Sequence, residues 1–192
     1  EDLGYRQTVV RALGERLRPG AAVVPALQNA LCSAANPRLM DSAAEGLARQ
    51  GEPGVAALGE VLAQERQGGS RRSAVCDGLG RAAGTTARDL LVHETKTASG
   101  RNRLPAFEAL KARANDPVVD ELRVPLARDK DVLVASTAVG QLAEHRRAEA
   151  PALALELSRR IDDRATPDQH ALLQRSERQS QTLAGLRDIL LP

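Results

Sequence analysis

Residues 37–62 read PRLMDSAAEGLARQGEPGVAALGEVL, and this stretch decides the fold. Asn36 is a good helix cap and Pro37 fits a first turn, so a helix begins here. Segment 50–54 holds two glycines and one proline, which break the chain before a second helix. Each helix carries an apolar stripe at helical spacing. The stripes comprise Leu39, Ala43, Ala44 and Leu47, and then Val55, Leu58, Val61 and Leu62. The stretch therefore predicts a helical hairpin.

The same pattern recurs along the chain, with successive leucines between 31 and 34 residues apart. One series, mostly preceded by a small residue, comprises Leu13, Leu47, Leu79, Leu110 and Leu142, and a second comprises Leu27, Leu58, Leu90, Leu122 and Leu155. Glycine in mid-helix costs stability, so Gly46 and Gly78 indicate close contacts between helices. A hairpin of about 30 residues cannot bury its own apolar face, so we expect the hairpins to stack.

The composition favours an all-α protein. The apolar share is 42%, and Tyr5 and Phe107 are the only aromatic residues. A core of Ala, Leu and Val suits helices that approach closely. Cys32 and Cys76 make no disulfide framework, and Cys76, on an apolar stripe, should be a buried free thiol. No apolar run is long enough to cross a membrane, and no signal peptide is recognisable. We expect a cytoplasmic protein, either processed or part of a longer chain.

These features resemble a HEAT repeat of the short bacterial kind that is related to phycobilin-lyase repeats. The best matches are Pro37 to Leu62 and Ala21 to Leu31, and the resemblance covers roughly residues 4–163. It implies one domain over residues 1–192 that forms a right-handed α-α superhelix of about five hairpins. The expected repeats are approximately 3–35, 36–68, 69–100, 101–129 and 130–164. Residues 165–192 would form a capping helix or helix pair, or alternatively a partner-binding tail.

The third repeat departs from the core pattern at Glu94. Three second helices repeat leucine at i and i+4, as Leu27/Leu31, Leu58/Leu62 and Leu122/Leu126, whereas Leu90 is followed at i+4 by Glu94. An unpaired buried carboxylate is costly. Either the helix therefore frays before the loop 98–100, or a polar site opens at this position. In the second case His93, Glu94 and Lys96 form the centre of a ligand or partner site.

Basic clusters raise the question of nucleic-acid binding. They are Arg71-Arg72, Arg101/Arg103, Arg146-Arg147 and Arg159-Arg160. Phosphate contacts along such a ridge would be salt-sensitive and independent of sequence. However, the net charge is only +2, and the aromatic residues on which single strands stack are missing. We expect a solvated arginine face, partly paired with Asp and Glu, and no nucleic-acid partner.

The sequence carries no recognisable catalytic, metal or cofactor motif. His93-Glu94 lacks the second histidine of a zinc-binding helix, and no Cys-x-x-Cys pair occurs. We therefore expect a non-enzymatic scaffold that binds proteins through its second helices, which line the concave face in HEAT-like arrays. One alternative is a lyase-like or ligand-binding protein with a site near His93 and Glu94, and another is weak, sequence-independent nucleic-acid binding through the arginine ridge. The expected partner contacts are Gln28, Asn29, Glu60, Gln64, Asp89, His93, Glu94, Lys96, Glu121, Arg123, Glu156 and Arg159.

Overall fold

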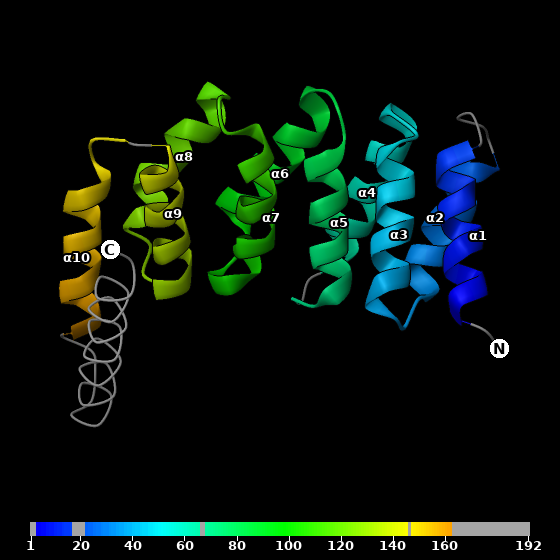
Figure 1. Cartoon of the computed structure of the whole chain (residues 1–192), viewed down its shortest axis with the longest axis horizontal. Helices are drawn as coiled ribbons and strands as arrows, with labels where there is room; N and C mark the ends of the chain where they lie inside the picture. Colours follow the sequence, from blue (N-terminus) through cyan, green and yellow to red (C-terminus); the bar gives the residue numbers. More distant parts are fainter. Residues whose placement is uncertain (1–2, 17–21, 66–67, 146, 163–192) are drawn as a thin grey trace, which may run out of the picture.

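The computed structural model describes residues 3–16, 22–65, 68–145 and 147–162, and this part of the chain holds ten α-helices and no strand (Figure 1). The all-α prediction is confirmed. The segment 165–192, expected to cap the array, lies outside the described residues. The helices are α1 (Leu3–Arg16), α2 (Val23–Ser33), α3 (Pro37–Ala48), α4 (Glu52–Gln64), α5 (Ser70–Arg81), α6 (Thr85–Thr97), α7 (Leu104–Ala109), α8 (Pro117–Ala127), α9 (Val132–Glu144) and α10 (Ala150–Asp162), with the short 3-10 helices η1 (Gly100–Arg103) and η2 (Leu110–Arg113) on either side of α7.

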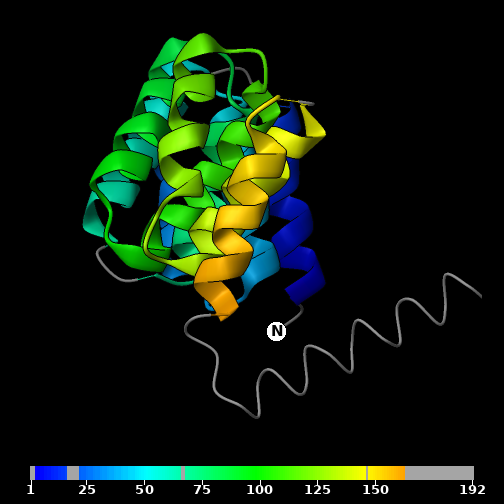
Figure 2. The same cartoon turned by 90° about the vertical axis from the view of Figure 1, so that its left-hand side faces the viewer.

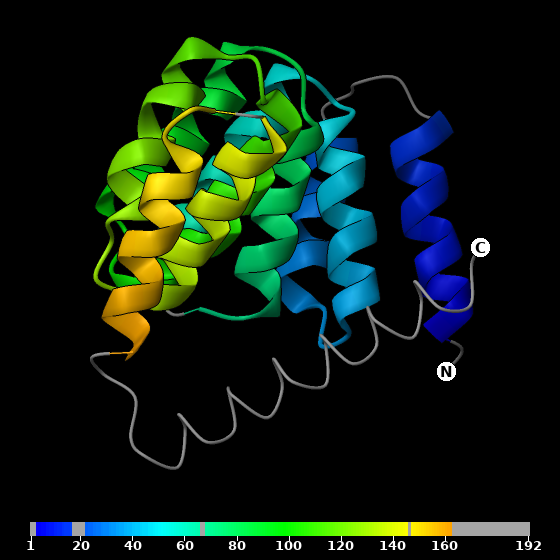
Figure 3. The same ribbon diagram turned by 60° about the vertical axis from the view of Figure 1, so that its left-hand side comes forward.

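We number consecutive helix pairs as hairpins, first to fifth from α1–α2 to α9–α10, although α8 of the fourth pair packs on α9 and not mainly on α7. The first helices α1, α3, α5 and α7 contact one another in order, and α2, α4 and α6 do the same behind them (Figure 1). Figure 3 shows α1 at one end of this arrangement and α10 at the other, and Figure 2 looks along it from the α10 end. The links between hairpins, such as 128–131, lie at one edge, the lower one in Figure 1.

Polar caps fix where several hairpins begin. Asn36, Asp116 and Asp131 each accept a hydrogen bond from the backbone N–H two residues further on, at 2.9 Å in all three cases. These caps satisfy donors that the first turn of a helix leaves free, and the cap at Asn36 confirms the predicted helix start. The helix α5 begins without a side-chain cap. Ser70 is already the first residue of α5, and Gly69, in the cap position, has no side chain to contribute.

The first leucine series forms the centre of the core. Four of its members are buried: Leu47, Leu79, Leu110 and Leu142. The side chain of the fifth, Leu13, lies outside the described residues. In the second series Leu27, Leu58 and Leu122 are buried, and Leu90 is half-buried over Gly59 of the neighbouring helix α4. The two series therefore describe the two helix layers of one shared core.

The second series does not extend to Leu155, which is 55% exposed. The helix α10 packs against α9 and buries Leu153 and Leu157. A residue midway between them points about 200° around the helix from either one. The period of the repeat thus holds in the fifth hairpin, but the core register of its second helix is shifted by two residues.

Small residues let α5 approach the helices on both of its sides. A Cβ atom on Gly78 would lie 2.9 Å from the carbonyl oxygen of Ala44 in α3. A Cβ atom on Gly80 would lie 2.9 Å from the carbonyl oxygen of Ala109 in α7. Both distances are shorter than a methyl group tolerates, so the close contact expected at Gly78 is confirmed. The segment Gly78-Leu79-Gly80 is a packing element that joins three hairpins.

The fourth hairpin is irregular. Its first helix is divided into η1, α7 and η2, and α7 has only six residues. Pro125 lies inside α8, where it removes one backbone donor. Phe107 fills the core between these pieces and is fully buried. Beyond this point α9 packs mainly against α8 and also contacts η1, so the regular succession of first helices ends here.

Candidate functional site

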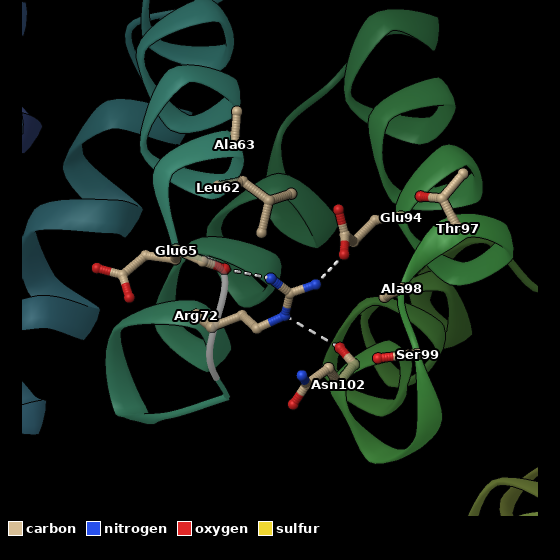
Figure 4. A pocket seen from close by; sticks show the side chains of 9 residues that line it. All are labelled: Leu62, Ala63, Glu65, Arg72, Glu94, Thr97, Ala98, Ser99 and Asn102. Atoms are coloured by element: carbon tan, nitrogen blue, oxygen red, sulfur yellow. Dashed lines mark hydrogen bonds and ion pairs between the residues drawn. The ribbon is translucent and has the colours of Figure 1, made fainter.

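A polar pocket of about 320 Å³ opens where the second, third and fourth hairpins meet. The C-terminal ends of α4 and α6, the first turn of α5 and the segment 98–102 surround it (Figure 4). Its lining residues are Leu62, Ala63, Glu65, Arg72, Glu94, Thr97, Ala98, Ser99 and Asn102. The position where the leucine pattern fails in the sequence therefore lies in the wall of a real cavity.

Arg72 is the centre of this pocket and is only 4% exposed. Its guanidinium donates to the carbonyl oxygen of Glu65 at 2.6 Å and to that of Asn102 at 3.0 Å. It also donates to the carboxylate of Glu94, with which it forms an ion pair (Figure 4). A buried charge is tolerated only when it is paired and hydrogen-bonded. Arg72 meets that condition, and its two backbone bonds connect Glu65, just before the third hairpin, to Asn102, just after it.

The two interpretations of Glu94 can now be separated. The helix α6 continues to Thr97, and the backbone N–H of Ala98 still bonds to the carbonyl oxygen of Glu94, so the interpretation as a frayed helix end is wrong. Glu94 occupies a leucine position because its carboxylate neutralises Arg72. His93 and Lys96 are exposed and do not line the pocket. Of the three residues expected at the centre of a site, only Glu94 belongs to the cavity.

The second carboxylate of the pocket is also paired. Glu65 accepts a hydrogen bond from Arg71 at 2.6 Å. Arg71 additionally donates to the backbone carbonyl of Cys32 at 2.9 Å, so it reaches back to the first hairpin. The hydroxyl of Thr97 donates to the carbonyl oxygen of His93, one turn earlier, at 2.8 Å. With both carboxylates held by arginines, the pocket is suited to hydrogen-bonding a polar group that carries no strong charge.

Of the twelve expected contact residues, eleven are at least partly exposed and one is not. The structure brings Gln28 and Glu60 together: the amide of Gln28 donates to the carboxylate of Glu60 at 3.1 Å, from α2 to α4. Glu156 pairs with Arg128 at 3.3 Å, and Asp89 with Arg88 at 2.7 Å. The others are exposed on their helices: Asn29, Gln64, His93, Lys96, Glu121 and Arg159.

Arg123 contradicts the expectation of an accessible contact, because its side chain is completely buried. It bonds to Asp120 at 2.7 Å and to the side-chain oxygen of Gln141 at 3.3 Å. Two of its nitrogens also reach the carbonyl oxygen of Ala114 at 3.3 Å. The face of α8 that carries Arg123 packs on α9 and does not meet solvent. The signal that could have revealed it is Gln141, a polar residue where the other repeats have Ala or Gly.

A second pocket of about 370 Å³ lies beside this buried arginine and was not foreseen from the sequence. The carboxylate of Asp120 forms an ion pair there with Arg147 at 2.8 Å, and it also accepts a hydrogen bond from Arg123. His145 also lines the cavity, and its Nε2 atom is buried without a hydrogen-bond partner among the described residues. The two pockets are therefore each built around a buried arginine and its carboxylate.

The basic clusters do not form a continuous ridge. Arg72 is buried, and Arg71 is bonded to backbone carbonyls. Arg103 pairs with Asp129 at 2.7 Å, whereas Arg101 stays 75% exposed. Arg146 lies outside the described side chains. Most of these arginines tie one hairpin to the next, in pairs with Asp and Glu as expected.

The thiol of Cys76 is not activated. Cys76 is a free and fully buried cysteine, as predicted, and burial raises the pKa of its thiol to about 12. A thiol with such a pKa is not a nucleophile near neutral pH. Cys32 is free and exposed.

No protein-family model and no curated protein matches the sequence, so similarity supplies no function. Within the described ranges, no three His, Cys, Asp or Glu residues are grouped as metal ligands. No described helix combines the length and apolar character needed to cross a membrane. The function of the chain is therefore inferred from the surfaces and pockets of its described residues.

Proposed function

We propose that this chain is a non-enzymatic protein-interaction scaffold, a single HEAT-like domain whose hairpins form a right-handed solenoid with a C-terminal cap. The bond between Gln28 and Glu60 carries the proposal, because it joins the neighbouring second helices α2 and α4 across 32 residues, a separation close to one repeat. Second helices in such register present their outer side chains as one continuous face. Solenoid proteins bind partners across faces of this kind.

Further support comes from the way the polar side chains are used. Many of their bonds join neighbouring hairpins at a separation close to one repeat: Arg72 to Asn102 (30 residues), Arg113 to Gly84 (29 residues), Lys111 to Glu144 (33 residues) and Arg160 to Asp129 (31 residues). These bonds fix the shape of the scaffold. The exposed side chains on α4 and α6, among them Glu60, Asp89 and Lys96, are then available to a partner.

The surface chemistry indicates the kind of binding to expect. Strong interfaces usually contain buried aromatic anchors. The one aromatic side chain that the structure describes, Phe107, is fully buried. The scaffold would therefore bind through shape and paired charges, with an affinity that falls as salt screens those charges.

A pull-down with two charge-reversal variants of the whole chain tests the proposal. Glu60→Arg with Asp89→Arg alters the exposed face of α4 and α6. Asp41→Arg with Glu108→Arg makes the same change in charge on the first helices α3 and α7, where both residues are exposed. We expect the first variant to lose the partner and the second to retain it, with both keeping a wild-type helical circular dichroism spectrum. If wild type captures no protein at low or moderate salt, or if both variants retain the partner, the proposal is wrong.

A further inference from the structure

The edge where the fourth and fifth hairpins begin carries a group of basic side chains that we call the basic edge. It comprises Arg101, Arg103, Arg128, Lys130, Arg159 and Arg160. Contacts with three carboxylates hold the group together. Arg101 lies 3.6 Å from Asp131, and Arg103 lies 2.7 Å from Asp129. Arg128 lies 3.3 Å from Glu156, which precedes Arg159 by one turn of α10. This edge is the lower left part of Figure 1.

Two of the three carboxylates of the basic edge are directed inward. Asp131 caps α9 by accepting from the backbone N–H of Leu133 at 2.9 Å, and its side chain is 19% exposed. Asp129 accepts from the backbone N–H of Asp131 at 2.8 Å and is 11% exposed. The third, Glu156, is 44% exposed, and Arg101 and Arg128 are more accessible still, at 75% and 59%. Because exposed basic side chains outnumber the one exposed carboxylate of the group, the outer surface of this edge is positive.

The arginines keep donors free for a further carboxylate. Arg101 and Arg128 approach their acidic partners through Nε, and neither donates a hydrogen bond from Nη to a described residue. Arg159 is exposed and forms no ion pair with another described side chain. The paired N–H groups of a guanidinium match the two oxygens of a carboxylate. The basic edge therefore presents several planar donor groups that are already held in place.

We propose that the basic edge binds a carboxylate-rich peptide segment of a protein partner. This inference rests on the proposed scaffold function and names the chemistry of its ligand. A short acidic segment fits better than a nucleic acid, because the basic side chains do not continue along the edge. At the third hairpin Arg71 and Arg72 turn inward to backbone carbonyls. A phosphate backbone needs a longer positive track, and single strands also need aromatic stacking surfaces.

Asp162 and Asp163 lie two and three residues after Arg160 in the sequence, so the test relies on Arg101 and Arg128 instead. The variant Arg101→Gln/Arg128→Gln removes two exposed charges from the basic edge. The matched control, Arg38→Gln/Arg81→Gln, removes two exposed charges from α3 and α5. Arg81 also pairs with a glutamate, at 3.2 Å, as Arg128 does. Circular dichroism establishes that both variants keep the wild-type helical content.

The probe is a fluorescein-labelled peptide of about ten residues, alternately Glu and Gly, which spans ~35 Å when extended. Fluorescence anisotropy measures its binding to the full chain, beside a Gln-for-Glu peptide and an oligothymidylate of equal length. We expect the Glu peptide to bind wild type about tenfold more tightly than the edge variant, and within about twofold of the control variant. The Gln peptide should not bind the wild type, the edge variant or the control variant.

Three results would overturn the inference: no binding of the Glu peptide, equal binding to both double variants, or tighter binding of the oligothymidylate with loss in the edge variant. The last result would identify a phosphate site. The pull-down with the Glu60/Asp89 variant separates the two proposals. If the peptide binds at the basic edge but the Glu60/Asp89 variant still captures the partner, only the proposal that partners bind the exposed face of α4 and α6 is wrong. If the partner is captured through α4 and α6 but the peptide does not bind, only the proposal of an acidic ligand at the basic edge is wrong.

Discussion

The contact of α5 with its neighbours and the contact of α8 with α9 bury their helices by opposite means. In the middle of α5, glycines at positions 78 and 80 bring backbones together, and the groups that they meet are the carbonyl and methyl groups of Ala44 and Ala109. Between α8 and α9, a fully buried Arg123 bonds to Asp120 and Gln141. The first contact is possible because glycine has no side chain, whereas the second requires the guanidinium of Arg123. One repeat pattern can thus be completed either by close packing or by a polar network.

The largest expected effect is at Arg123. Replacing it with Ala leaves Gln141 and the carbonyl of Ala114 without their partner inside the α8–α9 contact. Removing one member of a buried ionic network costs about 3 kcal/mol, which chemical denaturation would measure. Arg123→Met should recover only the part of that loss that comes from packing, because it fills the volume but leaves the same polar groups without the guanidinium. If Met is tolerated as well as arginine, the network is dispensable and the contrast with α5 fails.

At α5, Gly78→Ala should be destabilising by about 2 kcal/mol, since the new methyl group would press on the backbone of Ala44. Gly140→Ala is the matched control within α9, where no atom lies within 4 Å of the added carbon. That change should be neutral or raise stability by up to about 1 kcal/mol, because Ala is the better helix former. Thermal unfolding of both variants measures the difference, and equal effects would show that α5 is not closely packed.

High salt should also affect the stability of the two regions differently, although by less than the substitutions above. Exposed ion pairs join the fourth hairpin to the fifth, among them Lys111 with Glu144 and Arg128 with Glu156. At about 1 M salt such exposed pairs are largely screened. Hydrogen exchange should therefore show faster opening of α9 and α10 at high salt, with little change in α3 and α5. A uniform response along the chain would contradict this division.

The smallest effect concerns the link between the third and fourth hairpins. Arg88 bonds to Asp116 at 3.0 Å and lowers the pKa of that carboxyl below its ordinary value of 3.8. A group with a lowered pKa in the folded state stabilises above the ordinary value, and that stability is lost as the pH falls through the folded pKa. Asp116→Asn should keep the cap on α8 but flatten the fall in melting temperature below about pH 4. An unchanged acid profile would show that the pair contributes nothing.

Much of the fold could be predicted because local chemistry determines it. The stripes, the caps at Asn36, Asp116 and Asp131, and the small residue Gly78 all act within one helix or one contact with the next hairpin. Their effect can be read from spacing alone. The same reasoning found Glu94 as an irregular position, since a carboxylate in a leucine series is visible without coordinates.

The partners of the irregular positions could not be predicted. Arg72 lies 22 residues from Glu94, and Arg123 lies 18 residues from Gln141. Which side chains meet across a hairpin depends on how each helix is rotated, and that rotation differs between repeats. The exposed Leu155 shows the same effect, because α10 turns two neighbouring leucines inward instead. Arginine was therefore assigned to the surface where the structure uses it inside.

The paired glycines of α5 restrict how this gene product can change in length. Inserting or deleting one residue in a segment that links two hairpins, such as 128–131, would be absorbed there, but the same change between Gly78 and Gly80 would rotate everything after it by about 100°. Gly80 would then no longer face Ala109, and a side chain would take its place. Whole hairpins can be gained or lost at the linking segments, whereas α5 tolerates no change in its residue count.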